Sequence, residues 1–359
     1  MDIEKIRSLT VLSGGLTRTD IAREEADELP AASLYQRTLR TVMMDEALLA
    51  KAPRWRRTLY KKIPFAAAEA IESYALRGKF DVIISWSDMH ALFFAALLRL
   101  TCRRHPHVAL MFWISKPKKA FFLKYVQSRI STLVLWTSAH RDFAINRLGI
   151  PPEKIRFIPY YVDHKFYRPM HQDTDMICSV GIEMRDYPTF IEAMRGLDIR
   201  CHIAAGMARG KLFDTVKAIY REPSLPPSLT VGSLSPTELR QLYARSRFVV
   251  IPLLPTDSDN GLTTILEAMA MGKAVICSRT NGQRDVIVDG KTGIFVPQGD
   301  PNALREAIRY LWEHPEVADE MGREGRKLIE EKFTWEGFVA NIRDIVVETV
   351  AKERMNRKK

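Results

Sequence analysis

In the second half of the chain, short apolar runs alternate regularly with segments of helical periodicity. The runs are rich in β-branched residues and too short for helices, so they predict buried strands. They lie at residues 176–180, 200–204, 248–252, 274–277 and 293–296. The helical segments lie at residues 187–194, 210–219, 235–244, 264–271 and 301–313. Strict alternation of strand and helix predicts a parallel sheet covered on both faces, as in a doubly wound, Rossmann-like domain.

Two of these helices carry recognisable start signals. Ser235-Pro236-Thr237-Glu238 places a serine at the N-cap, a proline at the first helical position and a glutamate three residues after the cap. Asp300-Pro301 repeats the pattern of a cap followed by proline.

The first half follows the same pattern less regularly. Apolar runs at residues 8–12, 80–85, 108–114 and 132–137 predict buried parallel strands. Helical patterns follow at residues 91–100 and 141–148, whereas the polar stretch 18–57 carries no clear periodicity. A second, more divergent α/β domain is the simplest interpretation.

The segment that joins the two halves has the marks of a linker. Pro159 and Pro169 flank an extended, aromatic stretch. We therefore expect one domain at residues 1–168, a second at 169–335, and a C-terminal helix with a basic tail at 336–359. Ligands of open α/β sheets bind beyond the carboxyl ends of the strands, so two such domains predict an active cleft between them.

Length and composition agree with a soluble globular protein of two domains. The chain has 359 residues, of which 46% are hydrophobic and 27% charged. The four cysteines are widely spaced, which argues against a zinc site or a disulfide framework and fits a reducing cytosol. The first residues do not resemble a signal peptide, and the longest apolar run, 91–98, is far short of the roughly 20 residues that span a bilayer. We therefore expect a cytoplasmic protein.

The excess positive charge lies entirely in the first half. Residues 1–170 carry 28 Lys and Arg against 16 Asp and Glu, whereas residues 171–359 carry 26 against 27. Two clusters combine basic and aromatic residues: Lys51, Arg54, Arg56, Arg57, Lys61 and Lys62 with Trp55 and Tyr60, and Lys116, Lys118, Lys119 and Lys124 with Phe121 and Phe122. Such clusters suit peripheral contact with an anionic membrane or an acidic acceptor, and a solvated basic face is the alternative. Nucleic acid is not expected, since no nucleic-acid-binding motif accompanies the charge.

The richest chemistry lies in residues 252–297. A polar loop at 255–261 follows a predicted strand and leads into a helix, where free backbone N–H groups and the helix dipole favour an anion. Gly261 allows a ligand to approach the backbone closely. A diphosphate fits over the amides of Leu262, Thr263 and Thr264.

Two carboxylates accompany this anion site. Glu267, one turn into the helix, suits a ribose diol, and Asp259 on the loop suits a sugar hydroxyl. A structural alternative stands for each of them. Thr264 and Glu267 also have the spacing of a capping box, and Asp259 is an acid near the positive end of a helix.

The run from Asp259 to Ile276, DNGLTTILEAMAMGKAVI, resembles the signature of glycosyltransferase family 4. The resemblance continues in Gly282, Asp285 and the segments 289–293, 295–297 and 299–300, with a proline, valine and aspartate motif at 159–163. Val180-Gly181 and Arg185-Asp186-Tyr187 resemble the first strand, loop and helix of the family's donor domain. The similarity covers roughly residues 132–345.

The resemblance implies a GT-B fold, in which two Rossmann-like domains face a central cleft and the C-terminal helix returns to the first domain. It also implies retention of anomeric configuration, neither metal nor cofactor, and a nucleotide-sugar donor. A hexose-type sugar would pass from a nucleoside diphosphate to a hydroxyl acceptor, which is a glycan, a lipid-linked glycan or a small molecule. Residues 1–168 would bind the acceptor and residues 169–335 the donor.

Carried over by position, the resemblance assigns catalytic roles to Asp259, Glu267 and Arg185. It assigns donor contacts to Gly181, Gly232, Ser233, Asn260, Gly261, Leu262, Thr263, Thr264 and Glu267. Arg185 would neutralise the leaving phosphate, and Gly232 with Ser233 would border the base. Two positions depart from the family: Asp259 is shorter than the usual Glu, and Ile182 stands where many members have a second phosphate-binding Arg.

The candidates for the acceptor side are Gly14, Gly15, His90 and Lys116. A lone histidine near a helix start is also a common structural residue, and the two glycines also fit a plain strand-to-helix turn. Two other functions stay open: a nucleotide-sugar epimerase on the same fold, and a non-catalytic nucleotide-binding scaffold. The expected location is the cytoplasm, and peripheral contact with the inner face of the cytoplasmic membrane is a further expectation.

Overall fold

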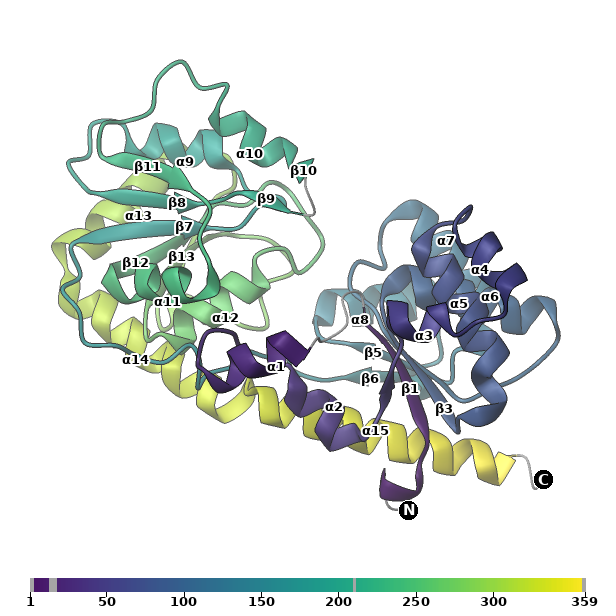
Figure 1. Ribbon diagram of the computed structural model, residues 1–359. Coiled ribbons are helices and arrows are strands. Elements are labelled where there is room, and N and C mark those ends of the chain that lie inside the picture. The colour runs from purple at the N-terminus through teal and green to yellow at the C-terminus, as the bar shows by residue number, and fades with distance from the viewer. Residues whose placement is uncertain (1–2, 13–17, 209–210, 357–359) are drawn as a thin grey trace. The chain divides into compact units, whose positions relative to one another are not determined.

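The computed structural model describes residues 3–12, 18–208 and 211–356, and the chain divides into two compact units (Figure 1). The first unit contains the residues up to Ala22, Ala32–Pro159 and the residues from Glu336 onward. The second contains Arg23–Ala31 and Tyr160–Trp335. The chain therefore changes unit at Pro159, not at residue 168, and residues 23–31 pack with the second unit.

The first unit is built on a parallel six-stranded sheet of order β2-β1-β3-β4-β5-β6. Its strands are β1 (Ser8–Leu12), β2 (Val42–Met43), β3 (Val82–Trp86), β4 (His107–Leu110), β5 (Thr132–Leu135) and β6 (Ile155–Phe157). Its helices are α1 (Arg18–Glu25), α2 (Ser33–Leu39), α3 (Glu46–Ala50), α4 (Arg54–Tyr60), α5 (Phe65–Leu76), α6 (Asp88–Leu100), α7 (Pro117–Val126), α8 (Ser138–Asn146) and, in its larger part, α15 (Trp335–Asn356). The end of α1 belongs to the second unit.

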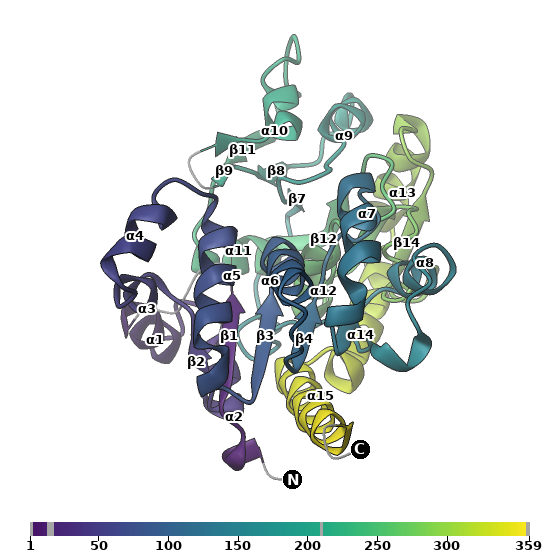
Figure 2. The same ribbon diagram turned by 90° about the vertical axis from the view of Figure 1, so that its right-hand side faces the viewer.

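Helices cover both faces of this sheet. On one face, Leu9 and Ile83 share a buried cluster with Ala70 of α5 and Phe94 of α6. Figure 2 shows α5, α6 and α7 running side by side across the strands. On the other face, the Trp86 ring lies 5.5 Å from the ring of Phe338, which belongs to α15. The expectation that the C-terminal helix returns to the first unit is confirmed.

The second unit repeats this architecture with the order β11-β8-β7-β12-β13-β14, again with every neighbouring pair parallel. Its strands are β7 (Met176–Val180), β8 (Cys201–Ala204), β11 (Leu229–Gly232), β12 (Ser246–Ile251), β13 (Ala274–Ser278) and β14 (Gly293–Val296), beside the small antiparallel pair β9 (Met207–Ala208) and β10 (Lys211–Leu212). Its helices are α9 (Tyr187–Met194), α10 (Asp214–Ile219), α11 (Pro236–Arg245), α12 (Leu262–Ala270), α13 (Pro301–Glu313) and α14 (Pro315–Lys332). The predicted Rossmann-like sheets are confirmed.

Local chemistry explains where two of these helices begin. At α11, the Ser235 side chain accepts a hydrogen bond from the Glu238 amide, and Glu238 accepts one from the Ser235 amide, as the capping box predicts. At α13, the Asp300 side chain accepts from the amides of Asn302 and Ala303. The helix predicted from residue 210 begins instead at Asp214, because Lys211 and Leu212 form β10.

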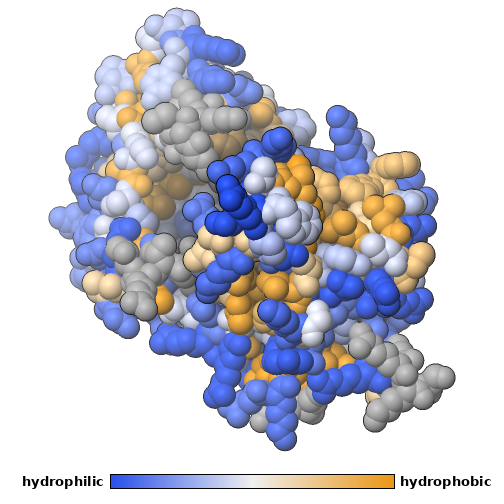
Figure 3. All heavy atoms as spheres, turned by 45° about the vertical axis from the view of Figure 1, so that its right-hand side comes forward, coloured by the Kyte–Doolittle hydropathy of each residue, from blue (hydrophilic) through white to orange (hydrophobic). Residues whose placement is uncertain are grey.

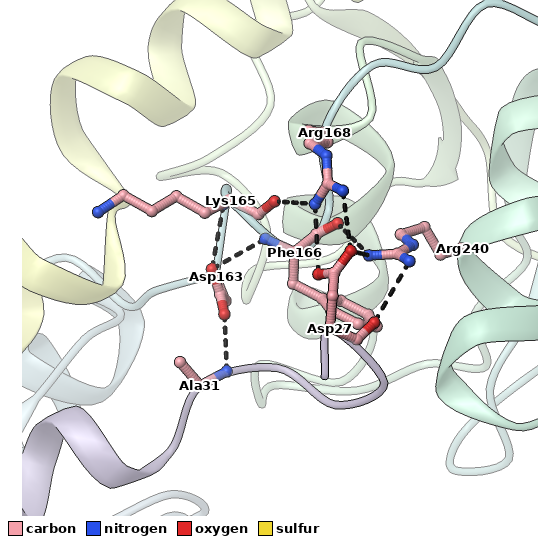
Figure 4. A network of polar contacts seen from close by, with 7 residues as sticks. All are labelled: Asp27, Ala31, Asp163, Lys165, Phe166, Arg168 and Arg240. Atoms are coloured by element: carbon pink, nitrogen blue, oxygen red, sulfur yellow. Dashed lines mark hydrogen bonds and ion pairs between the residues drawn. The ribbon is translucent and has the colours of Figure 1, made fainter. Parts of the chain in front are cut away.

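Polar contacts hold the segment 23–31 to the second unit (Figure 4). The Asp27 carboxylate lies 2.8 Å from Arg168 and 2.9 Å from Arg240. The hydrogen bond from Arg168 is the largest of several effects that lower the pKa of Asp27. Asp163 accepts a hydrogen bond of 2.7 Å from the Ala31 amide, so the aspartate of the 159–163 motif anchors the end of the segment 23–31.

Over the described ranges, no helix is both long enough and apolar enough to cross a bilayer. The four cysteines are free thiols, of which Cys102 is exposed and the other three are buried. No cluster of three or more potential metal ligands occurs among the described residues.

Candidate functional site

The order of strands in the second unit defines where a ligand is expected. β7 lies between β8 and β12, and the chain extends the sheet first on the β8 side and then on the β12 side. The segments that follow β7 and β12 therefore leave neighbouring strands at the same carboxyl edge. Open α/β sheets bind ligands at such a switch point.

Arg185 joins these two segments. Its side chain donates to Val180 O at 2.8 Å, to Glu183 O at 2.9 Å and to Thr264 Oγ1 at 3.0 Å. Arg185 is only 4% exposed, and among the described residues no carboxylate lies within ion-pair distance of it. A buried guanidinium that forms no close ion pair, beside a helix start, is an electropositive centre suited to an anionic ligand.

Gly181 makes room for this arginine. The residue has φ +116°, and a Cβ built on it would lie 2.3 Å from Nη2 of Arg185. Only glycine fits here, because any side chain would both strain the backbone and displace the guanidinium. The two residues that the family resemblance singled out separately thus form one local arrangement.

The start of α12 supplies backbone donors next to Arg185. Gly261 is the N-cap with φ +91°, and the first helical hydrogen bond runs from Ile265 N to Gly261 O at 3.0 Å. The Leu262 amide donates to Asp259 O at 3.0 Å, so the turn already uses it, contrary to our expectation of an open donor. The amides of Thr263 and Thr264 precede the helical ladder, and they are the donors placed for an anion.

The capping-box alternative for Thr264 and Glu267 is wrong. The cap of α12 is Gly261, which has no side chain, and the Thr264 hydroxyl accepts from Arg185 instead of capping the helix. Glu267 accepts a hydrogen bond of 2.8 Å from the Tyr243 hydroxyl. Both side chains therefore point to partners outside α12.

Glu267 is held in an environment that favours its protonated form. Burial raises its pKa to about 7, while hydrogen bonds from Tyr243 and Tyr167 and the charge of Arg185 act in the opposite direction. Near neutral pH the carboxyl group can therefore change charge. The sequence carried no signal for the two tyrosines, which come from α11 and from the segment before β7.

The loop before α12 is tied down from within. Ser258 Oγ donates to Asp259 Oδ1 at 2.8 Å, and Thr256 Oγ1 donates to the Asn260 side chain at 2.7 Å. Asp259 is partly exposed, whereas Asn260 is buried. The Asn260 side chain therefore accepts a hydrogen bond from within its own loop. This contact does not support the expected role of Asn260 in binding a donor.

A neighbouring loop fixes the same segment from outside. The Gln283 side chain donates to Asn260 O, and Gly282 lies so close that a Cβ on it would be 1.9 Å from Ser258 O. Gly282 was part of the family resemblance, but the role of Gln283 had no signal in the sequence.

Gly232 and Ser233 lie at the carboxyl end of β11, the edge strand. They share the carboxyl edge with Gly181, but β8 separates β11 from β7. Ser233 packs on Gly206, where a Cβ would lie 2.6 Å from its hydroxyl oxygen. The expected base-binding pair is therefore two strands away from Arg185.

Among the acceptor-side candidates of the first unit, His90 lies in the interior of the unit. His90 is fully buried, with Nδ1 2.8 Å from Ser85 Oγ and Nε2 3.1 Å from Ser73 Oγ. Burial and the nearby His107 hold its pKa well below the usual value. Both ring nitrogens are used inside the unit, so this position supports the structural role and not contact with an acceptor.

Lys116 is exposed at the N-cap of α7, with Nζ 3.7 Å from the centroid of the Trp113 ring. Gly14 and Gly15 lie outside the described residues.

The two basic clusters lie on α3, α4 and α7 and the segments next to them. Large aromatic side chains stand exposed among them: Trp55 is 68% exposed, Phe121 79% and Tyr125 51%. Some of the cations are paired, since Arg56 lies 3.1 Å from Glu72 and Lys119 pairs with Asp88. Figure 3 shows apolar and hydrophilic residues lying next to one another on the visible face.

Comparison with known proteins places the second unit in a family. Residues 175–328 match the family described as Glycosyl transferases group 1. The chain is similar to the D-rhamnosyltransferase WbpZ of Pseudomonas aeruginosa, with 27% identity over 211 residues, 58% of this chain and 50% of that protein. It is also similar to the sulfoquinovosyl transferase SQD2 of Arabidopsis thaliana, with 31% identity over 312 residues, 79% of this chain and 60% of that protein. The chain thus spans 50% and 60% of the length of these two relatives.

A solved structure matches both units. Anabaena Alr3699/HepE in complex with UDP and glucose has a TM-score of 0.70, covering 96% of this chain and 99% of that chain, at 15% identity. The likeness shows the GT-B fold.

Proposed function

Because the chain belongs to the glycosyl transferases group 1 family, we propose that it is a retaining, metal-independent glycosyltransferase. It moves a hexose-type sugar from a nucleoside-diphosphate sugar to a hydroxyl acceptor. The observation that carries the proposal is the hydrogen bond from Arg185 to Thr264, which holds a buried guanidinium beside the start of α12.

The chemistry follows from electrostatics. When the bond between the anomeric carbon and the diphosphate oxygen breaks, its electron pair stays on the diphosphate. Arg185 and the amides of Thr263 and Thr264 stabilise this charge where it develops. The acceptor oxygen forms the new bond to the anomeric carbon, and its proton passes to the leaving phosphate.

Two further groups bind the donor. Glu267, in its ionised form, accepts hydrogen bonds from the ribose hydroxyls, and Asp259 contacts the sugar. Gly232 and Ser233 border the base. The UDP and glucose in the complex of the Anabaena protein support a uridine diphosphate sugar as the first donor to test. The second domain takes the donor and the first takes the acceptor.

The first domain also contacts the anionic inner face of the cytoplasmic membrane, where a lipid-linked acceptor resides. The support is the pairing of exposed Trp55 and Phe121 with the surrounding lysines and arginines. Each basic residue near an anionic surface contributes about 1 kcal/mol, and the aromatic rings suit the interface.

The activity is tested by incubating the protein with a panel of nucleotide sugars and candidate acceptors. Transfer releases free nucleoside diphosphate together with a glycosylated acceptor. A new nucleotide sugar without release would establish an epimerase instead. Binding of a nucleotide sugar without any turnover would indicate the scaffold alternative.

Membrane contact is tested with vesicles that contain an anionic phospholipid. Binding should fall steeply with salt and weaken when Trp55 and Phe121 are both replaced by Ala. The matched control is Tyr220→Ala, which removes a 65% exposed aromatic ring from the second unit. Binding that ignores salt, or that responds equally to both changes, would exclude the contact.

A further inference from the structure

A cavity of about 170 Å³ lies at the amino edge of the sheet in the first unit. Its lining comes from the residues just before β4, β5 and β6 and from the end of α15. Four of the lining residues are cations: Arg104, Arg129, Lys154 and Lys352. We call this cavity the amino-edge pocket.

The amino-edge pocket is separate from the site proposed above. Residues that bind an acceptor follow the strands and lie at the carboxyl edge of the same sheet. The donor residues belong to the second unit. The glycosyl transfer proposed for this protein therefore gives the amino-edge pocket no role.

The cations of the pocket form no close ion pairs with acids of the described residues. Within the described ranges, no carboxylate lies within ion-pair distance of any of the four. Glu353 is the only acid in the lining, and it accepts a hydrogen bond of 2.8 Å from Ser131 Oγ. Four cations against this one acid leave the lining with an excess of positive charge.

Arg129 shows this most clearly. Its Nε is shielded from solvent and has no hydrogen-bond partner in the described structure. A buried N–H donor without a partner costs about 1–3 kcal/mol, so such groups normally face a ligand or a water molecule.

Lys154 is also in an environment that disfavours its positive charge. Burial lowers its pKa most, the charges of Arg104 and Lys352 also lower it, and the charges of Glu353 and Glu153 act in the opposite direction. One of its donors reaches Gln127 O at 3.2 Å. An anion in the pocket would relieve the repulsion among these cations.

We propose that the amino-edge pocket binds a phosphate group, carried by inorganic phosphate or by a small phosphate ester. Guanidinium forks and hydroxyl groups suit a tetrahedral oxyanion, and the lining holds Arg104, Arg129, Ser128 and Ser131. The volume favours one phosphate group over a whole nucleotide, because pockets for larger ligands are about 300–1,000 Å³.

The bound anion also secures α15. Lys352 belongs to α15, whereas Arg129 and Lys154 precede β5 and β6. The helix already docks there through Thr349 Oγ1, 2.7 Å from Thr132 Oγ1. An anion shared by Lys352 and the other cations adds a contact between α15 and the sheet.

Equilibrium dialysis with radiolabelled inorganic phosphate at fixed ionic strength tests the proposal. The full chain is used with Arg185→Gln in every sample, so that binding at the donor site does not enter the measurement. Arg129→Gln with Lys154→Gln should weaken binding by about 100-fold, or about tenfold for each lost charge-assisted hydrogen bond. The matched control, Lys118→Gln with Lys124→Gln, removes the same charge from exposed positions of α7 and should leave binding unchanged.

A second measurement separates binding from folding. Phosphate should raise the Tm of the Arg185→Gln chain relative to chloride at equal ionic strength. Arg129→Lys with Lys154→Arg, which keep the charges, should retain that rise in the same background, and Arg129→Gln with Lys154→Gln should abolish it. Absence of saturable binding in the Arg185→Gln chain, or equal loss in the pocket and control variants, would overturn the proposal. Neither result bears on glycosyl transfer, which is measured separately with donor and acceptor.

Discussion

The two units share one architecture and differ in how their polar groups are used. In the second unit, Arg185, the start of α12 and Glu267 gather where two strands end, and Arg185 forms no close ion pair with a described carboxylate. In the first unit, His90 sits at the corresponding place after β3, yet Ser73 and Ser85 satisfy both of its nitrogens. The fold is therefore the same, and function depends on which polar groups remain available to a ligand.

The largest expected effect is that of Arg185→Gln. Removal of one charge-stabilising group at a developing anion should lower kcat by about 100- to 1,000-fold. Steady-state kinetics with a saturating donor measures this. The matched control is Arg305→Gln, because Arg305 also donates to backbone carbonyls, those of Ala193 and Glu192, away from the site. If both variants lost kcat equally, the effect of Arg185→Gln would be structural, and Arg185 would not be assigned to the leaving diphosphate.

Glu267 should make donor binding depend on pH. Its pKa of about 7 means that the carboxylate, which accepts from ribose, is lost as the pH falls through about 7. The donor KM of the unsubstituted enzyme should therefore rise at lower pH. Glu267→Gln should raise KM by about tenfold and remove this dependence. A pH profile that survives the substitution would refute the assignment.

His90 and Glu267 should influence folding in opposite directions with pH. A histidine with a lowered pKa binds its proton less well in the folded state, so the free energy of unfolding decreases as the pH falls below 6.5. A carboxyl group with a raised pKa favours the folded state at low pH, and its contribution decreases as the pH rises from 4.5 to about 7. Urea unfolding of His90→Leu and of Glu267→Gln, compared with the unsubstituted chain between pH 4.5 and about 7, measures how each group changes the free energy of unfolding with pH.

His90→Leu should change stability and leave turnover alone. The substitution removes one hydrogen bond each from the hydroxyls of Ser73 and Ser85, of which Ser85 keeps its contact of 2.8 Å with His107 Nε2. The loss at the buried Ser73 hydroxyl should lower the free energy of unfolding by about 1–3 kcal/mol. Denaturant titration at neutral pH measures it. A changed acceptor KM with unchanged stability would return His90 to the acceptor site.

The smallest effect concerns the segment 23–31. Asp27→Asn weakens two contacts of a half-exposed carboxylate, and surface ion pairs contribute about 1 kcal/mol or less. Thermal unfolding should show a small decrease in Tm and unchanged kcat. Asp214→Asn, which breaks only an exposed pair within one helix, is the control and should have no measurable effect on Tm.

The sequence predicted the second unit better than the first for a physical reason. Its strands are apolar runs between strongly amphipathic helices, and both cap signals at Ser235 and Asp300 are local. The stretch 18–57 forms short helices of two turns or fewer, whose periodicity is too brief to stand out. Assignment of residues 23–31 to the second unit depends on contacts with Arg168 and Arg240, which no local pattern contains.

In the candidate site, too, the sequence predicted features with a local pattern and missed those that depend on distant residues. Gly261 and Glu267 could be found because neighbouring residues in the chain carry the motif. The tyrosines that bind Glu267 are brought to it by tertiary packing, because Tyr243 lies 24 residues before it in the chain. The turn that uses the Leu262 amide is local, but the sequence pattern did not distinguish it from an open helix start. The role of His90 was open for the same reason, since burial decides it.

The anchoring of residues 23–31 has a practical consequence for dissecting the protein. A fragment of residues 160–335 would lack Asp27 and leave Arg240, which is 8% exposed, with one acidic partner fewer. A second unit that is to be exchanged between relatives therefore has to be taken as two stretches of sequence, 23–31 and 160–335. Chimaeras joined at a single crossover would separate an arginine from its aspartate, unless both parents carry that pair.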